Sequence, residues 1–145
     1  MKRTCKAFTM VELMVVVLIV GILVSAAIPM MKGRTDASKW SEAKMAMGTI
    51  ATALRAYGSE KGSFSGAPSL ADIGILNGDL DGTYFSHGAY AITSASASEG
   101  RTSFVITCTA ADSTRADVPT SPAGMALTCN SGNGYTATFA GLGGE

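Results

Sequence analysis

The sequence predicts an α+β fold in which one long N-terminal helix packs on a small antiparallel β-sheet. Three observations predict it. Residues 13–31 contain no charged side chain, apolar residues recur at helical spacing in residues 40–57, and short segments rich in β-branched and aromatic residues follow. The first two patterns are typical of one helix in two different environments, and the third is typical of strands.

The length and charge of the chain argue against several classes of protein. The chain has 145 residues, and its 11 basic and 11 acidic side chains cancel. This length suits one compact domain with an appendage, and the charge balance argues against a basic nucleic-acid binder. The sequence has a single histidine, His87, with no cluster of metal ligands and no glycine-rich phosphate loop. We therefore expect that the protein is not an enzyme and binds no nucleic acid.

The uncharged N-terminal run is long enough to cross a membrane. Its 19 residues span about 28 Å as an α-helix, close to the thickness of a bilayer core. Lys2, Arg3 and Lys6 precede the run, so the positive-inside rule predicts a cytoplasmic N-terminus and export of the remainder. We expect the chain to be anchored in a membrane or exported.

An ordinary secretory signal peptide is the alternative. It shares the basic start and apolar centre, and Ser25, Ala26 and Ala27 provide small residues for cleavage. Cleavage after Ala27 by ordinary signal peptidase would release a soluble exported domain. Two details argue against this alternative: Glu12 lies at the mouth of the apolar run, and helical spacing resumes directly beyond Pro29.

The position of Glu12 has two interpretations. A charge deep in a membrane helix costs about 3 kcal/mol on insertion scales, so such acids usually have partners. Glu12 either lies in the first helical turn near the headgroups, where the helix dipole favours an anion, or meets a cation on a neighbouring copy. A cut before Phe8 would create a suitable cation, the new α-amino group. The spacing leaves both interpretations open.

The order of these features resembles the N-terminus of type IV pilins and type II secretion pseudopilins. The resemblance lies in the stretch AFTMVELMVVV at residues 7–17 and continues through Pro29. It implies that prepilin peptidase removes residues 1–7 by cutting between Ala7 and Phe8, and then methylates the Phe8 amine. The family usually has glycine where this chain has Ala7.

The resemblance also implies roles in assembly. Glu12 would pair with the Phe8 amine of an adjacent subunit, and Gly21 and Pro29 lie where helices of the family have weak points. A proline inside a helix removes a hydrogen bond and favours a kink. The implied architecture is the ladle shape of the pilin family.

The resemblance implies four parts of the chain, its location in the cell and its partners. The expected parts are a leader (residues 1–7), a transmembrane and polymerisation helix (8–31), an amphipathic half-helix (32–57) and a globular head with an αβ loop (58–145). The precursor would span the bacterial inner membrane once and then enter a periplasmic pseudopilus or an extracellular pilus. The expected partners are other copies and related pilins, prepilin peptidase, the inner-membrane assembly platform and, before assembly, lipid. A low-copy minor pilin with an adhesion or DNA-uptake role is the alternative function.

The head is expected to be a helix packed on three or four antiparallel strands. On the helix the apolar stripe is Trp40, Ala43, Met47, Ile50, Leu54 and Tyr57, and Gly58 is the expected stop. The predicted strands are residues 89–94, 103–109, 125–129 and 135–139, separated by segments rich in Gly, Ser and Asn. One face of this sheet is expected to lie on the stripe.

The three cysteines differ in their expected compartments. Cys5 lies in the leader and should be reduced, whereas Cys108 and Cys129 end two predicted strands of the exported head, where oxidation is expected. A disulfide between them would contribute about 3 kcal/mol in the chain-entropy model. Pilins often carry a disulfide-bounded C-terminal loop, which is consistent with this pairing. Two buried free thiols are the alternative.

Polar residues of the head suggest no catalytic site. Residues 77–82 resemble half of a calcium loop, but the distal glutamate of an EF-hand is missing. A turn is the preferred interpretation, so we expect no cofactor and no metal ligands, with calcium left open. Asp112, Arg115 and Asp117 are expected on a solvated surface, and His87 is expected in a turn or on the surface.

Overall fold

The computed structural model describes residues 8–143. The chain forms two compact units, Met1–Arg34 and Thr35–Glu145, and helix α1 (Met10–Lys61) contributes residues to both. The predicted leader, residues 1–7 with Cys5, lies outside the described residues, as does the Ala7 side of the predicted cut. The predicted boundaries of the four parts stay predictions.

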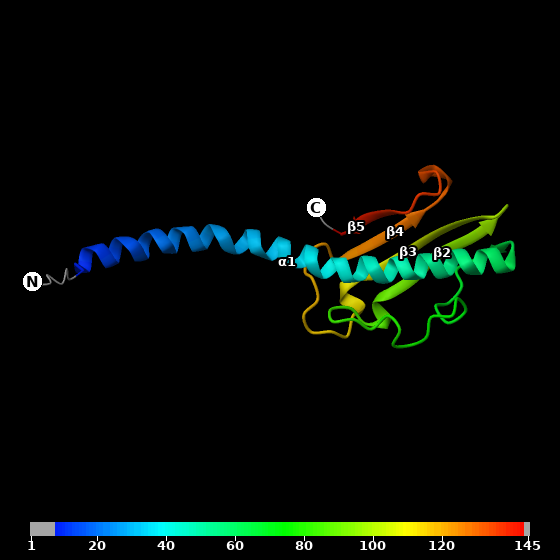
Figure 1. Ribbon diagram of the computed structural model, residues 1–145, viewed down its shortest axis with the longest axis horizontal. Coiled ribbons are helices and arrows are strands. Elements are labelled where there is room, and N and C mark those ends of the chain that lie inside the picture. Colours follow the sequence, from blue (N-terminus) through cyan, green and yellow to red (C-terminus); the bar gives the residue numbers. More distant parts are fainter. Residues whose placement is uncertain (1–7, 144–145) are drawn as a thin grey trace, which may run out of the picture. The chain divides into compact units, whose positions relative to one another are not determined.

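Within the second unit, α1 buries the apolar stripe that its sequence predicts, except that Tyr57 at its end is only half-buried. Trp40, Ala43, Met47, Ile50 and Leu54 are each at most 2% exposed. Because they recur every three or four residues, they lie on one face of the helix. Figure 1 shows this part of α1 running along one face of the sheet. The predicted packing of helix on sheet is confirmed.

The helix ends later than the sequence indicates. The expected stop at Gly58 is wrong, because α1 continues to Lys61 and Gly62 follows with a left-handed φ of 74°, as is common just beyond a helix C-terminus. Gly58 is instead a point of close approach to the sheet. A Cβ added there would lie 2.6 Å from Thr102 Oγ1 and 3.3 Å from Ala97 Cβ, so only glycine allows this packing.

Five antiparallel strands form one sheet in chain order. They are β1 (Phe64–Ser65), β2 (Tyr90–Ser98), β3 (Arg101–Thr109), β4 (Gly124–Cys129) and β5 (Thr138–Leu142). The prediction missed the two-residue β1 and placed the last strand too early. Gly134 and Tyr135 both have positive φ, 59° and 61°, which prolongs the turn before β5. The α+β fold class is confirmed.

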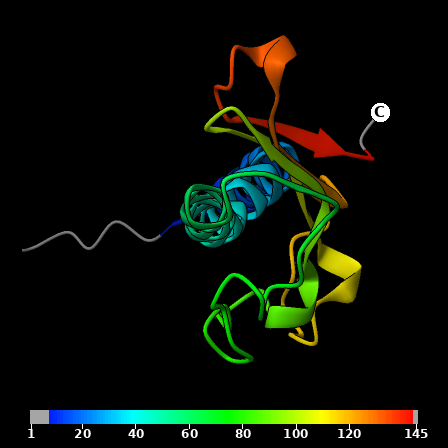
Figure 2. The same cartoon turned by 90° about the vertical axis from the view of Figure 1, so that its right-hand side faces the viewer.

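The core lies between α1 and one face of the sheet. Phe104 and Ile106 of β3 and Leu127 of β4 belong to it, each at most 2% exposed. The long loop before β2 adds Phe85, whose ring centre lies 4.9 Å from that of Trp40. In Figure 2 this loop (green) lies below α1, the sheet lies to one side, and the loop between β4 and β5 (orange) lies above.

The two cysteines of the head are too far apart to form the predicted disulfide. In the β3–β4 ladder Cys108 pairs with Met125, and Cys129 pairs with Phe104. The cysteines are therefore four positions apart in register, or about 13 Å along the strands, whereas a disulfide requires Cα atoms within about 7 Å. Both thiols are free and buried. The structure contradicts the predicted disulfide and has the alternative, two buried thiols.

The buried thiol of Cys108 is expected to lower the stability of the fold at alkaline pH. Burial, and secondarily the charge of Asp112, raises the pKa of Cys108 from 9.0 to about 12. Between these values the unfolded chain has lost a proton that the folded chain retains, so stability falls as the pH rises. We expect the urea midpoint of the protein in uncharged detergent to fall between about pH 7 and pH 10, and Cys108→Ala to reduce this fall.

A second group shifts stability in the same direction, so the Cys108→Ala effect is partial. Burial raises the pKa of the Tyr90 hydroxyl above its ordinary value of 10.0, and this contribution remains in the variant. An identical fall in the variant and the wild-type protein would contradict the role assigned to Cys108.

Candidate functional site

The segment that carries the predicted assembly residues is an exposed apolar helix. Residues 8–35 are all exposed, including Phe8 at 76% and Leu13 at 55%. Near its N-terminus α1 contains a window long and apolar enough to cross a membrane, by length and composition, and none of that window is buried in the structure. Apolar surface costs about 25 cal/mol per Å² in water, so this segment requires lipid or protein around it.

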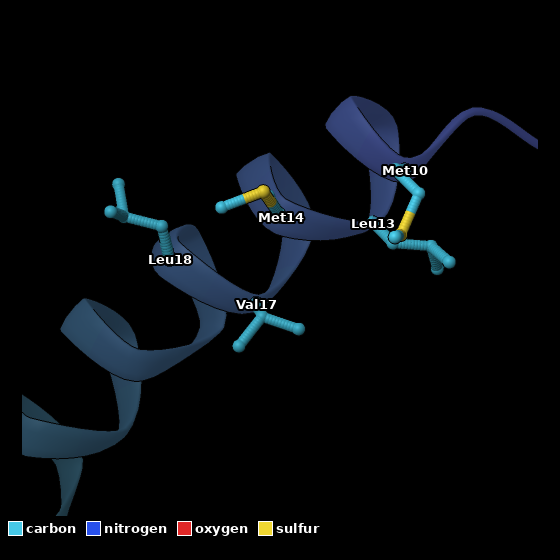
Figure 3. A pocket seen from close by; sticks show the side chains of 5 residues that line it. All are labelled: Met10, Leu13, Met14, Val17 and Leu18. Carbon is cyan, nitrogen blue, oxygen red and sulfur yellow. The ribbon is translucent and has the colours of Figure 1, made fainter.

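Apolar side chains alone line a hollow near the start of α1. Met10, Leu13, Met14, Val17 and Leu18 line a hollow of about 400 Å³. Figure 3 shows that these side chains point outward from successive turns and present only carbon and sulfur atoms. Such a surface offers packing contacts without hydrogen bonds, which suits lipid tails or another apolar helix.

A capping box fixes the first turn of α1. The Thr9 N–H and the Thr9 hydroxyl both donate to Glu12 Oε2 at 3.2 Å, and the Glu12 N–H donates to Thr9 Oγ1 at 3.3 Å. This reciprocal pair satisfies N–H groups that a helix terminus otherwise leaves without partners. The Thr-x-x-Glu spacing before an apolar run is its sequence signal, and it identifies Thr9 as a residue that the helical pattern alone misses.

The capping box leaves part of the Glu12 carboxylate available. Both hydrogen bonds that it accepts end on Oε2, and among the described residues Oε1 has no hydrogen-bond partner. The carboxylate therefore caps its own helix through one oxygen and presents the other to a second donor. The two interpretations of Glu12, a first-turn cap and a partner for a neighbouring cation, are compatible.

The other two predicted assembly residues lie inside the helix. α1 continues through Gly21 and Pro29 without interruption. A Cβ added at Gly21 would meet nothing within 4 Å, so packing within the chain does not require glycine there. Pro29 has no N–H and removes one helical hydrogen bond. Their roles as weak points during assembly stay predictions.

In the head, Asp36 and Lys39 of α1 anchor the loop between β3 and β4. Asp36 Oδ2 accepts hydrogen bonds from the Thr120 hydroxyl (2.8 Å), the Thr120 N–H (3.0 Å) and the Ser121 N–H (3.1 Å). The Thr120 hydroxyl is the largest cause that lowers the Asp36 pKa, against the opposing effect of burial. Lys39 Nζ lies 2.6 Å from Asp117 Oδ1. Asp117 is exposed, as predicted, but its carboxylate also pairs with the helix.

Glu42 of α1 holds the long loop that precedes β2. Its Oε2 accepts from the Thr83 N–H (3.0 Å), and its Oε1 accepts from the Tyr84 and Phe85 N–H groups (2.9 and 3.0 Å). A side chain on Gly82 would collide with this carboxylate, so the glycine makes room for it. Glu42 lies off the apolar stripe of the helix, and its partners lie more than 40 positions away. Helical spacing therefore does not reveal this contact.

The half calcium loop of the sequence forms turns. Asp79 Oδ2 accepts a backbone N–H of its own turn at 2.8 Å, and Asp81 Oδ1 accepts the His87 N–H at 2.7 Å. Asp81 Oδ2 also lies 3.8 Å from Arg115 Nη2. Among residues 8–143 no three His, Cys, Asp or Glu side chains are grouped so that they could hold a metal ion. These carboxylates stabilise the loop itself.

Comparisons with known proteins match only part of the chain. Residues 2–28 match the family model of the prokaryotic N-terminal methylation motif. A stretch of 60 residues is 43% identical to the type IV major pilin protein PilA of Myxococcus xanthus (strain DK1622), and it covers 41% of this chain but only 27% of that relative. No solved structure matches the chain. By the motif and by this partial match, the chain is similar to type IV pilins.

Proposed function

We propose that this chain is the precursor of a filament subunit of the type IV pilus. Prepilin peptidase cuts between Ala7 and Phe8 and methylates the new amine, and the mature chain leaves the inner membrane through an assembly platform. The observation that carries the proposal is the exposed apolar helix whose first turn coincides with the matched methylation motif. The type IV pilin family is structural, so the proposal includes no enzymatic activity.

Assembly replaces lipid by neighbouring copies around the same helix. In the membrane, acyl chains cover residues 8–31; in the filament, the corresponding segments of other subunits cover them. A carboxylate in such surroundings needs a cation. Glu12 Oε1, which has no hydrogen-bond partner among residues 8–143, accepts the Phe8 amine of the next subunit, and this contact sets the register of stacking.

The similarity to the Myxococcus xanthus pilin favours a pilus over a secretion pseudopilus as the filament that this chain forms. The similar stretch of 60 residues belongs to a protein named as a type IV major pilin. This preference concerns the destination of the filament, outside the cell rather than in the periplasm, and leaves the assembly mechanism unchanged.

Fractionation of the native host tests the proposal. We expect antibodies against the head to detect the chain in filaments sheared from the cell surface and to label those filaments in electron micrographs. A strain that lacks the gene for this chain is the control. Detection in the cell membrane alone, with unlabelled surface filaments, would contradict a role as a pilus subunit.

A further inference from the structure

We propose that the head has an oxyanion-binding site between Arg55 of α1 and Arg101 of β3, which takes the carboxylate or phosphate group of a small ligand. The two arginines line one pocket of about 310 Å³. The other lining residues are uncharged; they are Ser59, Gly100, Thr102, Cys129 and Tyr135. The site lies within the Thr35–Glu145 unit, so it does not depend on the proposed filament.

Both guanidinium groups are positioned by aromatic rings. Arg55 Cζ lies 5.3 Å from the centre of the Phe104 ring, and Arg101 Cζ lies 5.2 Å from the centre of the Tyr135 ring. A cation–π contact uses the flat face of the guanidinium and leaves its five N–H donors at the edge for other partners. Arg55 makes one weak contact there, from Nη2 to Cys129 Sγ at 4.0 Å.

Neither arginine of the pocket has a carboxylate partner within residues 8–143. Elsewhere in the head Lys39 pairs with Asp117, and a third arginine, Arg115, lies near Asp81. The pocket is thus lined by two cationic side chains that have no ion-pair partner among the described residues. An oxyanion bound there would pair with them through the fork geometry in which arginine binds carboxylate and phosphate.

One wall of the pocket is fixed by its backbone. Tyr135 has a φ of 61°, which is uncommon for a residue other than glycine and persists only where the surroundings hold it. Its N–H donates to Asn130 O at 2.8 Å, and its carbonyl accepts from Cys129 Sγ at 3.2 Å. The ring that supports Arg101 is therefore placed before any ligand arrives, which lowers the entropy cost of binding.

A hollow on another flank of α1 is lined by acidic rather than basic side chains. Arg55 and Glu60 are about 140° apart around the helix at 100° per residue. Glu60 and Asp72 line a separate hollow of about 290 Å³ on the side of the loop that precedes β2, whereas the loop carrying Tyr135 lies on the other side (Figure 2). The two pockets therefore differ in charge, in a chain whose formal net charge is zero.

Nuclear magnetic resonance on the ¹⁵N-labelled full chain in uncharged detergent tests the site. Sodium phosphate and sodium acetate are titrated separately at constant ionic strength, and the Gly100 and Thr102 amides and the arginine side-chain N–H signals are followed. We expect saturable shifts confined to these signals, with a Kd of the order of millimolar. Arg55→Gln and Arg101→Gln should each weaken binding at least tenfold, whereas Lys44→Gln, the same charge change elsewhere on α1, should not.

Each outcome decides the proposal. Saturation by phosphate alone assigns a phosphate-bearing ligand, and saturation by acetate, alone or as well, assigns a carboxylate. Shifts that grow linearly without saturation, or an equal loss in Lys44→Gln, would show only general attraction of anions and overturn the site. Signals outside the pocket that are unchanged in a variant verify that it is folded. If Arg55→Gln fails to fold, the test uses Arg101→Gln, at the exposed start of β3.

Discussion

Replacing Glu12 with alanine is expected to reduce filaments at least about a hundredfold while the protein remains in the membrane. Loss of one partner of a buried ion pair costs about 3 kcal/mol or more, which corresponds to a hundredfold in an equilibrium constant. The apolar helix that anchors the chain is otherwise unchanged. Counting sheared filaments and measuring the chain in the membrane fraction by immunoblot give the two readouts.

The capping box provides the matched control for Glu12. Thr9→Ala removes the two hydrogen bonds that use the Thr9 hydroxyl. It keeps the one from the Thr9 N–H and it keeps the carboxylate. The loss of such a cap costs about 1 kcal/mol, so we expect a much smaller effect on filaments. Normal filaments from Glu12→Ala would contradict the pairing role. Equal losses in the two variants would assign the effect to helix capping.

Replacing Glu42 with alanine is expected to destabilise the head by about 3 kcal/mol, because three backbone N–H groups lose a charged acceptor. Two of these groups belong to Tyr84 and Phe85, and Phe85 is fully buried against Trp40. Without the carboxylate the loop no longer has a fixed position on α1, and the contact between these two rings weakens. Urea unfolding followed by Trp40 fluorescence measures the loss.

Two variants separate the hydrogen bonds of Glu42 from general effects of charge. Glu42→Gln keeps one acceptor oxygen and should lose about half as much stability. Glu60→Ala removes the same charge and similar side-chain atoms from an exposed position of the same helix, and should change stability by less than about 0.5 kcal/mol. A loss in Glu42→Ala no greater than that in Glu60→Ala would refute the loop-holding role.

The elements with a regular period could be predicted from the sequence. The stripe from Trp40 to Leu54 repeats every three or four residues and is buried as expected. β3 includes all of the predicted segment 103–109. These predictions succeed because periodicity depends only on neighbours along the chain. The N-terminal segment was predictable for another reason, since its residue order alone matches a known motif.

The features that failed or were missed depend on tertiary register. Cys108 and Cys129 both end strands, but the ladder pairs them with Met125 and Phe104, and the ladder cannot be derived from spacing. Glu42 likewise looks solvated until the fold brings a distant loop onto it. Gly58 is a residue type that commonly ends a helix. Only the close approach of the sheet shows why glycine stands there.

The pocket between Arg55 and Arg101 could not be predicted, for the same reason. Arg55 lies on a helix, Arg101 begins a strand, and Tyr135 follows a short 3₁₀ turn. These residues share no motif, so their convergence on one pocket is a consequence of topology. The Thr9–Glu12 capping box, in contrast, has a local sequence signal, which periodicity does not reveal.

The N-terminal residue and intact mass of the protein purified from its native host would show whether it is processed as a pilin. We expect a mature chain that begins at Phe8 and carries the mass of one added methyl group on its amine. Such a chain retains the whole exposed apolar helix and creates the cation for Glu12. A chain that begins at Ile28 would lack that helix, and its detection would contradict the assignment as a pilin-type filament subunit.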